Sequence, residues 1–287
     1  MANTIEAVYV QTYERILRQL AQQSESRLRP FVMERPSGGE NHNWERLNDA
    51  EAVTKTGRTA TVDAEGTQDY SRRVSVAQTK HISNYTEQED VVQMIVDPNS
   101  NMSMSQGMAM KRAYDDEIIA AATGDALDGD GVAVPFPAAQ TVGDGTAPIS
   151  FDMVTEVTEK FLDNDIDEDE AKCFVVGPKQ IRKLLQLTEV TSADYVHLKA
   201  LEQGKVSFWM GYTWIPSTRL LIPLADELTC FAMTKRALGL QVNKDIWARI
   251  VEDQTQSFAW LIYAASTFGA VRVEDEHIVQ VHVADTL

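Results

Sequence analysis

About fifty residues, Pro36 to Tyr85, constrain the fold most, because they hold too few large apolar side chains to enclose a core. They are rich in Gly, Asn, Thr and charged residues. Their clearest regular signal is an alternation from Val74 to Ile82, which predicts β structure with successive side chains on opposite faces. We therefore expect a long, projecting β-hairpin that must rest on its own body or on a neighbouring molecule.

The segments on either side of this stretch predict helices. From about Thr4 to Arg29, apolar residues recur at helical spacing and Pro30 follows, which predicts an amphipathic helix. From about Asn101 to Thr123 the pattern predicts one long helix that ends at Gly124. At about 1.5 Å per residue this helix would span roughly 35 Å, which is long enough to brace a domain.

The rest of the chain mixes helices with short strands. Helices are expected from Phe151 to Leu162 and from Lys179 to Leu187, with a strand at Lys172–Val176 between them. The regular βαβα order of a doubly wound sheet is missing, so the predicted fold class is α+β. Further strands are expected at Val206–Met210, Tyr212–Ile215, Leu228–Met233, Ile246–Val251, Ser257–Phe268, Val271–Val273 and His277–Val283.

The charge is unevenly distributed. The net charge is −17, and residues 123–170 alone hold 13 acidic residues against the single base Lys160, a net of −12. A surface of this sign repels phosphate backbones, which argues against a dedicated DNA-reading or RNA-reading domain. The one basic cluster, Arg15, Arg18, Arg27 and Arg29, alternates with acids and is typical of a solvated helix face.

The chain shows no sign of a membrane or export role. No apolar run approaches the roughly 20 residues that a bilayer requires, and the amino terminus lacks the pattern of a cleaved signal. Cys173 and Cys230 each lie in an apolar run, where a buried free thiol is the usual state. We expect a reducing compartment and no disulfide.

A search for catalytic motifs is negative. Asp130 stands where a phosphate-binding loop would need lysine, and the serine-hydrolase, zinc-protease and paired-cysteine motifs are missing. The turn Asp163–Glu170 imitates a calcium loop but lacks its glycine and closing glutamate. His277 and His282 would face opposite sides of one strand. The sequence therefore predicts no catalytic, cofactor-binding or metal-binding residues and no enzyme.

The order of elements resembles the major capsid proteins of tailed double-stranded DNA bacteriophages, which have the Hong Kong 97 fold. The resemblance covers nearly the whole chain. Ala120–Gly124 resembles the end of that family's spine helix, and Gly269–Val273 resembles its returning strands. Its most specific part is the series Phe174–Pro178, Gly204–Val206 and Gly211–Ser217.

The resemblance implies a division of the chain. The chain would comprise an amino-terminal arm helix at 1–35, an extended loop at 36–88, and a peripheral domain with the spine helix at 89–149. An axial domain at 150–225 and peripheral return strands at 226–287 would complete it.

The resemblance also implies a function and partners. The chain would assemble into hexamers and pentamers of an icosahedral head, in the host cytoplasm, and would reside in the virion. A separate scaffolding protein, a portal and a cement protein would be partners, and packaged DNA would be contacted weakly and without sequence specificity. Some relatives cross-link through a lysine and an asparagine, but no local motif supports such a bond between Lys55 and Asn243.

Six residues are the candidates for contacts between subunits. They are chosen because the arm and the hairpin cannot bury their own apolar faces. The candidates are Arg15, Arg18, Trp44, Leu47, Arg72 and Arg73.

Two other hypotheses remain open from sequence. A cellular nanocompartment of the encapsulin type would need the same shell geometry and would enclose an enzyme in place of a genome. An α+β enzyme would place its site in the loop Asp125–Ser150 and the turn Asp163–Glu170, and would form a monomer or a small oligomer.

Overall fold

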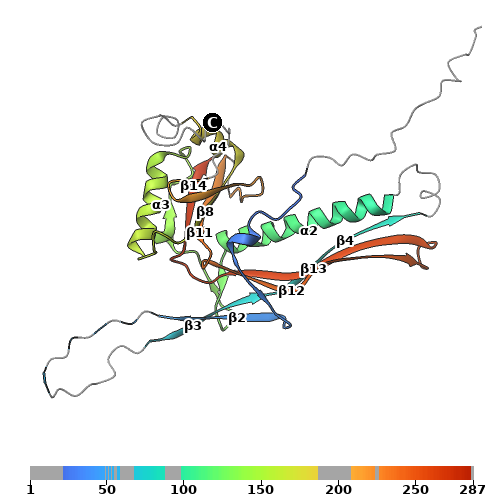
Figure 1. Cartoon of the computed structure of the whole chain (residues 1–287), viewed down its shortest axis with the longest axis horizontal. Coiled ribbons are helices and arrows are strands. Elements are labelled where there is room, and N and C mark those ends of the chain that lie inside the picture. Colours follow the sequence, from blue (N-terminus) through green and yellow to red (C-terminus); the bar gives the residue numbers. More distant parts are fainter. Residues whose placement is uncertain are drawn as a thin grey trace, which may run out of the picture. The chain divides into compact units, whose positions relative to one another are not determined.

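The computed structural model describes residues 22–48, 50, 52, 54, 57–58, 68–87, 98–186, 208–223 and 226–285 (Figure 1). The chain divides into two compact units, which are described separately. Unit 1 comprises Met1–Glu25, Lys80–Arg112 and Ile246–Ser266. Unit 2 comprises Ser26–Thr79, Ala113–Asp245 and Thr267–Leu287.

A six-stranded mixed sheet forms the core of unit 2. Strand β8 (Lys172–Val176) runs parallel to β10 (Tyr212–Pro216) and antiparallel to β11 (Glu227–Thr234). In β8 the run Cys173–Val176 is apolar throughout and buried, as expected of a strand covered on both faces. The sheet order is β7 (Thr141–Val142), β14 (Ile278–Ala284), β11, β8, β10 and β9 (Phe208–Trp209).

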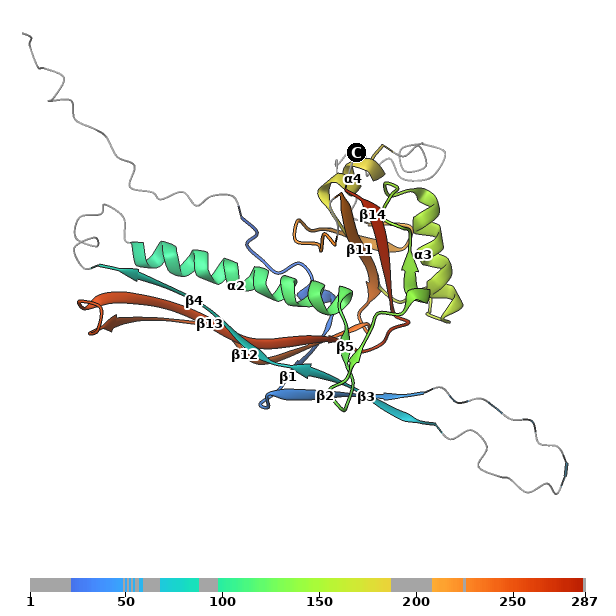
Figure 2. The same ribbon diagram turned by 180° about the vertical axis from the view of Figure 1, so that it is seen from behind.

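Helix α3 (Phe151–Asp163) packs against this sheet at β14 and β7 (Figures 1 and 2). Its amino end is capped by Ser150, whose hydroxyl accepts a hydrogen bond from the Met153 backbone N–H at 3.3 Å. Its buried face consists of Val154, Val157 and Phe161. Helix α4 (Pro178–Leu184) follows β8 with proline in its first turn.

The predicted hairpin is present as two paired strands, at residues 41–47 and 70–76. Strand β2 (Asn41–Leu47) pairs antiparallel with β3 (Tyr70–Val76) in unit 2, with Leu47 opposite Tyr70. The predicted alternation from Val74 to Ile82 is not one strand, because the chain is interrupted at Ala77. Strand β4 (Gln78–Thr86) leaves the hairpin and joins a second sheet.

That second sheet has the order β1, β12, β13 and β4. Strand β1 (Met33–Pro36) runs parallel to β12 (Leu238–Asp253), and β13 (Ala259–Arg272) lies between β12 and β4. The long strands β12 and β13 replace three shorter strands expected from sequence. Gly269 lies inside β13 and does not end the strand. The backbone at Val76 passes close to Gly269, so that a Cβ at this position would meet the Val76 carbonyl oxygen.

Unit 1 is built from parts of α2, β4, β12 and β13. The Gln106 side chain, 3% exposed, donates through Nε2 to the Ile262 backbone carbonyl at 3.2 Å. At the end of β4, the Tyr85 hydroxyl donates to Asp253 at 2.9 Å. Tyr263 stacks on His81 with a 5.8 Å separation of ring centroids.

The long predicted helix is confirmed as α2 (Pro98–Thr123), and it begins three residues before the predicted Asn101. It ends at Thr123 as expected, with the Gly124 N–H donating to the Ala120 carbonyl at 2.8 Å. Two short pairs of strands complete the fold: β5 (Ala126–Leu127) with β6 (Ala133–Val134), and β7 with β14. The remaining elements are single 3-10 turns, η2 (Arg29–Phe31) and η3 (Ala138–Gln140).

One sequence expectation needs correction, and one expected boundary falls within a sheet. The predicted arm helix does not reach Arg29, because Gln22–Leu28 is irregular and only the η2 turn follows; the expected helix before Gln22 lies outside the described residues. The expected boundary at residue 225 falls between strands of one sheet, since β11 pairs with β8 of the 150–225 segment, and β14 pairs with β11 and β7. The physical reason is that their apolar faces complete the core around β8.

Candidate assembly surfaces

The point where the amino-terminal arm leaves unit 2 is anchored by Asp115. This carboxylate, on α2, is 3% exposed. It accepts hydrogen bonds from the Ser26 hydroxyl at 2.6 Å and from the backbone N–H groups of Arg27 and Leu28, each at 3.1 Å. Charge-assisted bonds of this kind are among the stronger ones in proteins. Asp115 on α2 therefore determines the path of the chain at Ser26.

Arg29 continues this anchor. Its guanidinium lies 4.8 Å from the centre of the Tyr114 ring and pairs with Glu34 at 2.7 Å and Asp245 at 3.2 Å. The hydrogen bonding of the guanidinium to the Glu34 carboxylate is the largest of the effects that raise the pKa of Arg29, so this side chain stays charged. The sequence places Arg29 on a solvated helix face, whereas the structure uses it to hold the arm and β1 together.

The hairpin is attached to unit 2 by Trp44. The ring is 7% exposed and packs in a cluster with Ala126, Val271 and Val273. Its indole N–H donates to the Ser75 hydroxyl at 3.1 Å, which in turn donates to Gln241 at 2.8 Å. A Cβ at Gly239 would lie 2.5 Å from the Trp44 ring, so glycine is required at that position.

Arg73 is the second attachment of the hairpin. It is 7% exposed and pairs with Asp275 at 2.8 Å. The other oxygen of Asp275 pairs with the fully buried Arg272 at 2.6 Å. Arg272 also donates to the backbone carbonyls of Gly124, Val134 and Pro135. One carboxylate therefore pairs with two buried guanidinium groups, one from the hairpin and one from β13.

Strand alternation places Leu47 and Tyr70 on the other face of the hairpin. This cross-strand pair is 49% and 78% exposed. Beside it, Arg72 pairs with Glu45 at 2.9 Å, and both side chains are about half exposed. Tyr70 was missed by the sequence reasoning, although its register opposite Leu47 follows once the hairpin pairing is known.

The six candidate residues therefore separate into three groups. Trp44 and Arg73 lie inside unit 2, where they attach the hairpin to its own chain. Leu47 and Arg72 are exposed and available to a partner. Arg15 and Arg18 lie outside the described residues, as does Lys55; Asn243 donates to the Gly39 carbonyl.

The structure separates the acidic residues that a catalytic site would have to bring together. Asp115 binds the arm, whereas its neighbour Asp116 forms an ion pair with Arg219. The turn Asp163–Glu170 lines a groove of about 710 Å³, but none of the lining residues comes from the loop Asp125–Ser150. Within the described part of the chain, no three His, Cys, Asp or Glu side chains are grouped to hold a metal ion.

His277 lies 2.9 Å from Glu274 and His282 lies 2.8 Å from Glu227, so the two rings have separate partners. Among the helices described, none is long and apolar enough to cross a membrane.

Both cysteines are buried free thiols, as predicted. Burial raises the pKa of Cys173 and of Cys230 to about 12, because the thiolate would lose its hydration. We expect neither thiol to react with a maleimide at pH 8 in the folded chain, where the thiolate fraction is roughly one in ten thousand. Mass spectrometry should show two additions only after unfolding; one addition to the folded chain would contradict this assignment.

Comparison with solved structures identifies the fold. The chain is similar to the capsid of cyanophage P-SCSP1u, with a TM-score of 0.77, 14% identity, and coverage of 100% of this chain and 97% of that one. It is similar to a Mycobacterium phage Che8 structure, with a TM-score of 0.75, 17% identity and coverage of 96% and 97%. For the mature capsid of bacteriophage PhiM1 the TM-score is 0.72 and the identity is 12%, with coverage of 98% of this chain and 93% of that one. The architecture is thus the Hong Kong 97 type found in phage capsid proteins.

The family follows from the sequence. A family model described as phage capsid protein matches residues 5–285, and the chain belongs to that family. It is a structural major capsid protein, and its location is the capsid of the virion. A comparison with curated proteins found no match. The sequence left three hypotheses, namely a phage capsid protein, a cellular nanocompartment and an α+β enzyme. The family and the fold are those of phage capsid proteins and not of enzymes.

Proposed function

We propose that this chain assembles into hexamers and pentamers that close into an icosahedral head around double-stranded DNA. The observation that carries the proposal is a firmly attached hairpin with an exposed apolar pair on its outer face. Trp44 and the Arg73–Asp275 ion pair fix its base, and Leu47 and Tyr70 remain exposed beyond it. A fixed base with an uncovered apolar pair is suited to contact with another subunit.

The proposed interface uses the exposed candidates. Leu47 and Tyr70 would supply apolar area, and the Arg72–Glu45 pair beside them would supply a polar rim. Arg15 and Arg18 of the arm would contact a neighbouring subunit. The anchor at Asp115 supports this role, because it determines where the arm leaves unit 2.

The remaining partners are proposed from the family. Assembly would take place in the host cytoplasm with a scaffolding protein and a portal, and a cement protein would bind the finished shell. Packaged DNA would be held by weak contacts without sequence specificity, because the chain carries a net charge of −17. The division of the chain into arm, extended loop, peripheral and axial parts remains a proposal.

Electron microscopy and sedimentation of the expressed full-length chain, with and without the scaffolding protein, test the proposal. Closed particles or isolated hexamers and pentamers are expected. A chain that remains a folded monomer under both conditions, at concentrations up to about 1 mM, would rule the proposed function out.

A substitution pair tests the proposed interface. Leu47→Asp with Tyr70→Asp should reduce particle yield about tenfold or more, because charge replaces the apolar area that a partner would cover. Both side chains are exposed, so the free energy of unfolding of the monomer should change by less than about 1 kcal/mol. The matched control is Val132→Asp, at a residue 63% exposed. Normal particle yield from the double variant would remove Leu47 and Tyr70 from the interface.

A further inference from the structure

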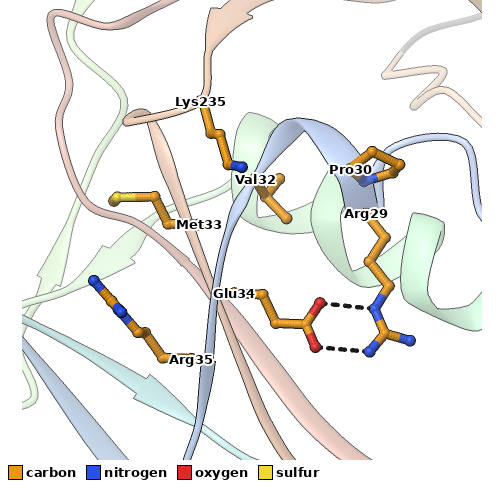
Figure 3. A pocket seen from close by; sticks show the side chains of 7 residues that line it. All are labelled: Arg29, Pro30, Val32, Met33, Glu34, Arg35 and Lys235. Carbon is orange, nitrogen blue, oxygen red and sulfur yellow. Dashed lines mark hydrogen bonds and ion pairs between the residues drawn. The ribbon is translucent and has the colours of Figure 1, made fainter.

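A pocket of about 400 Å³ lies beside η2 and β1 in unit 2 (Figure 3). Figure 3 shows Lys235 and Arg35 on either side of Met33, apart from the Arg29–Glu34 pair. The charged residues of its lining are three cations and one carboxylate: Arg29, Arg35, Lys235 and Glu34.

The cations of this pocket are not balanced within the chain. Glu34 is engaged by Arg29, which donates to both of its oxygens, at 2.9 and 2.7 Å, and also pairs with Asp245. Arg35 and Lys235 are exposed, and neither side chain has a hydrogen bond or ion pair with any residue that the structure describes. Two uncompensated cations therefore border a concave surface on a chain whose net charge is −17.

The opposite imbalance is found in the turn after α3. Five exposed carboxylates occur there, and within the described ranges none has a side-chain partner. Lys172 contacts the backbone of this turn and not its carboxylates, because its ammonium group donates to the backbone carbonyls of Asp167 and Glu168. These five carboxylates, which we call the acidic turn, are Asp163, Asp165, Asp167, Glu168 and Asp169.

The two surfaces do not neutralise each other inside one copy. Asp165 and Asp167 line the 710 Å³ groove together with Arg236, whereas Lys235 lines the other pocket. No ion pair joins the acidic turn to Arg35 or Lys235 in the described part of the chain. The groups of opposite charge are therefore free to pair between molecules.

We propose that Arg35 and Lys235 of one copy bind the acidic turn of a second copy, a contact that rests on the proposed shell function. A DNA phosphate is the other anion that such a site could take. It is disfavoured because a duplex would bring its charges against the whole acidic surface, whereas a second copy presents a short turn to the pocket alone. Paired charges of this kind select the partner surface and the register of docking.

Charge reversal separates these possibilities. Arg35→Glu with Lys235→Glu (the pocket variant) should reduce the assembled fraction about tenfold or more, and Asp167→Lys with Asp169→Lys (the turn variant) should do the same. Mixing the two variants should restore co-assembly, because each reversed surface then meets its complement on the other chain. A chain carrying all four changes should also assemble. Sedimentation velocity and electron microscopy measure both results.

The matched control restores the net charge without restoring the contact. The pocket variant combined with Glu156→Lys and Glu159→Lys, two exposed positions on α3, regains the original net charge and should still fail to assemble. Unchanged thermal unfolding of every variant shows that the exposed substitutions leave the subunit folded.

Each alternative outcome is decisive. If the wild-type chain assembles and neither the mixture nor the fourfold variant does, the proposed contact is wrong, whereas failure of the wild type itself would refute the shell function. If the turn variant assembles normally and the pocket variant yields closed particles with reduced DNA content, the pocket binds phosphate and the contact between copies is overturned. Rescue by the α3 control would reduce the effect to net charge and would also overturn it.

Discussion

Replacing Asp275 with asparagine should lower the free energy of unfolding by about 3–5 kcal/mol, the cost of removing one partner from a buried ion pair. Asp275 balances Arg272, which is fully buried, and Arg73, which is 7% exposed. The amide keeps the size of the side chain but removes its charge, so two desolvated guanidinium groups lose their counter-ion.

The measurement is thermal and denaturant unfolding of the assembly-incompetent monomer, for example the Leu47→Asp, Tyr70→Asp variant. The melting temperature should fall by roughly 6–20 °C for a chain of this size. Asp163→Asn is the control, since that exposed carboxylate has no partner among the described residues and its loss should cost within about 0.5 kcal/mol. A cost below about 1 kcal/mol for Asp275→Asn would contradict the shared-carboxylate interpretation.

The substitution Asp275→Asn should also destabilise the hairpin. Arg73 is the residue through which β3 is tied to Asp275, and Trp44 is the other attachment. Hydrogen exchange in β2 and β3 should therefore accelerate more than exchange in β8 and β11, which lie in the six-stranded sheet. Uniform acceleration would show that Asp275 stabilises unit 2 as a whole and not the hairpin in particular.

The second large effect is expected at Asp115. In Asp115→Asn one of the two oxygens that accept backbone N–H groups becomes an NH2 group, which cannot accept a hydrogen bond, and the charge that strengthens the remaining bonds is lost. The segment Ser26–Leu28 should open more often. We expect trypsin to cleave after Arg27 about 10- to 100-fold faster than in the wild type, consistent with a local loss of about 1.4–2.8 kcal/mol.

Mass spectrometry of the product identifies cleavage at Arg27, and particle yield gives a second readout. Asp116→Asn is the matched control, because its ion pair with Arg219 is more than one-third exposed and such pairs contribute at most about 1 kcal/mol. Equal cleavage rates in the two variants would mean that Asp115 does not hold the arm. A faster rate with unchanged particle yield would mean that the anchor does not serve assembly.

The two anchors explain how one subunit can present extensions to its neighbours without being disordered at their bases. Asp115 orders the start of the arm, and Asp275 with Trp44 orders the start of the hairpin. Contact area beyond each base can then be buried by another copy at a lower cost in conformational entropy, because part of the ordering has already taken place. Many modest contacts repeated by symmetry give a shell its cohesion.

The class of fold, the long helix and the buried β8 strand could be predicted because their signals are local. Helical spacing of apolar residues, Gly124 after Thr123, and an uninterrupted apolar run act within a few neighbouring residues. The absence of a core in residues 36–85 also followed from counting side chains, and it correctly implied that the hairpin rests on something else.

The surface on which the hairpin rests was decided only by long-range packing. Trp44 lies against Gly239, and Arg73 reaches Asp275, positions nearly 200 residues away in the chain. No local pattern marks such partners, because burial of an aromatic ring or pairing of a buried charge depends on what the fold brings beside it. The same reason made Trp44 and Arg73 look like interface residues in the sequence, whereas the folded chain covers both and leaves Leu47, Tyr70 and Arg72 uncovered for a partner.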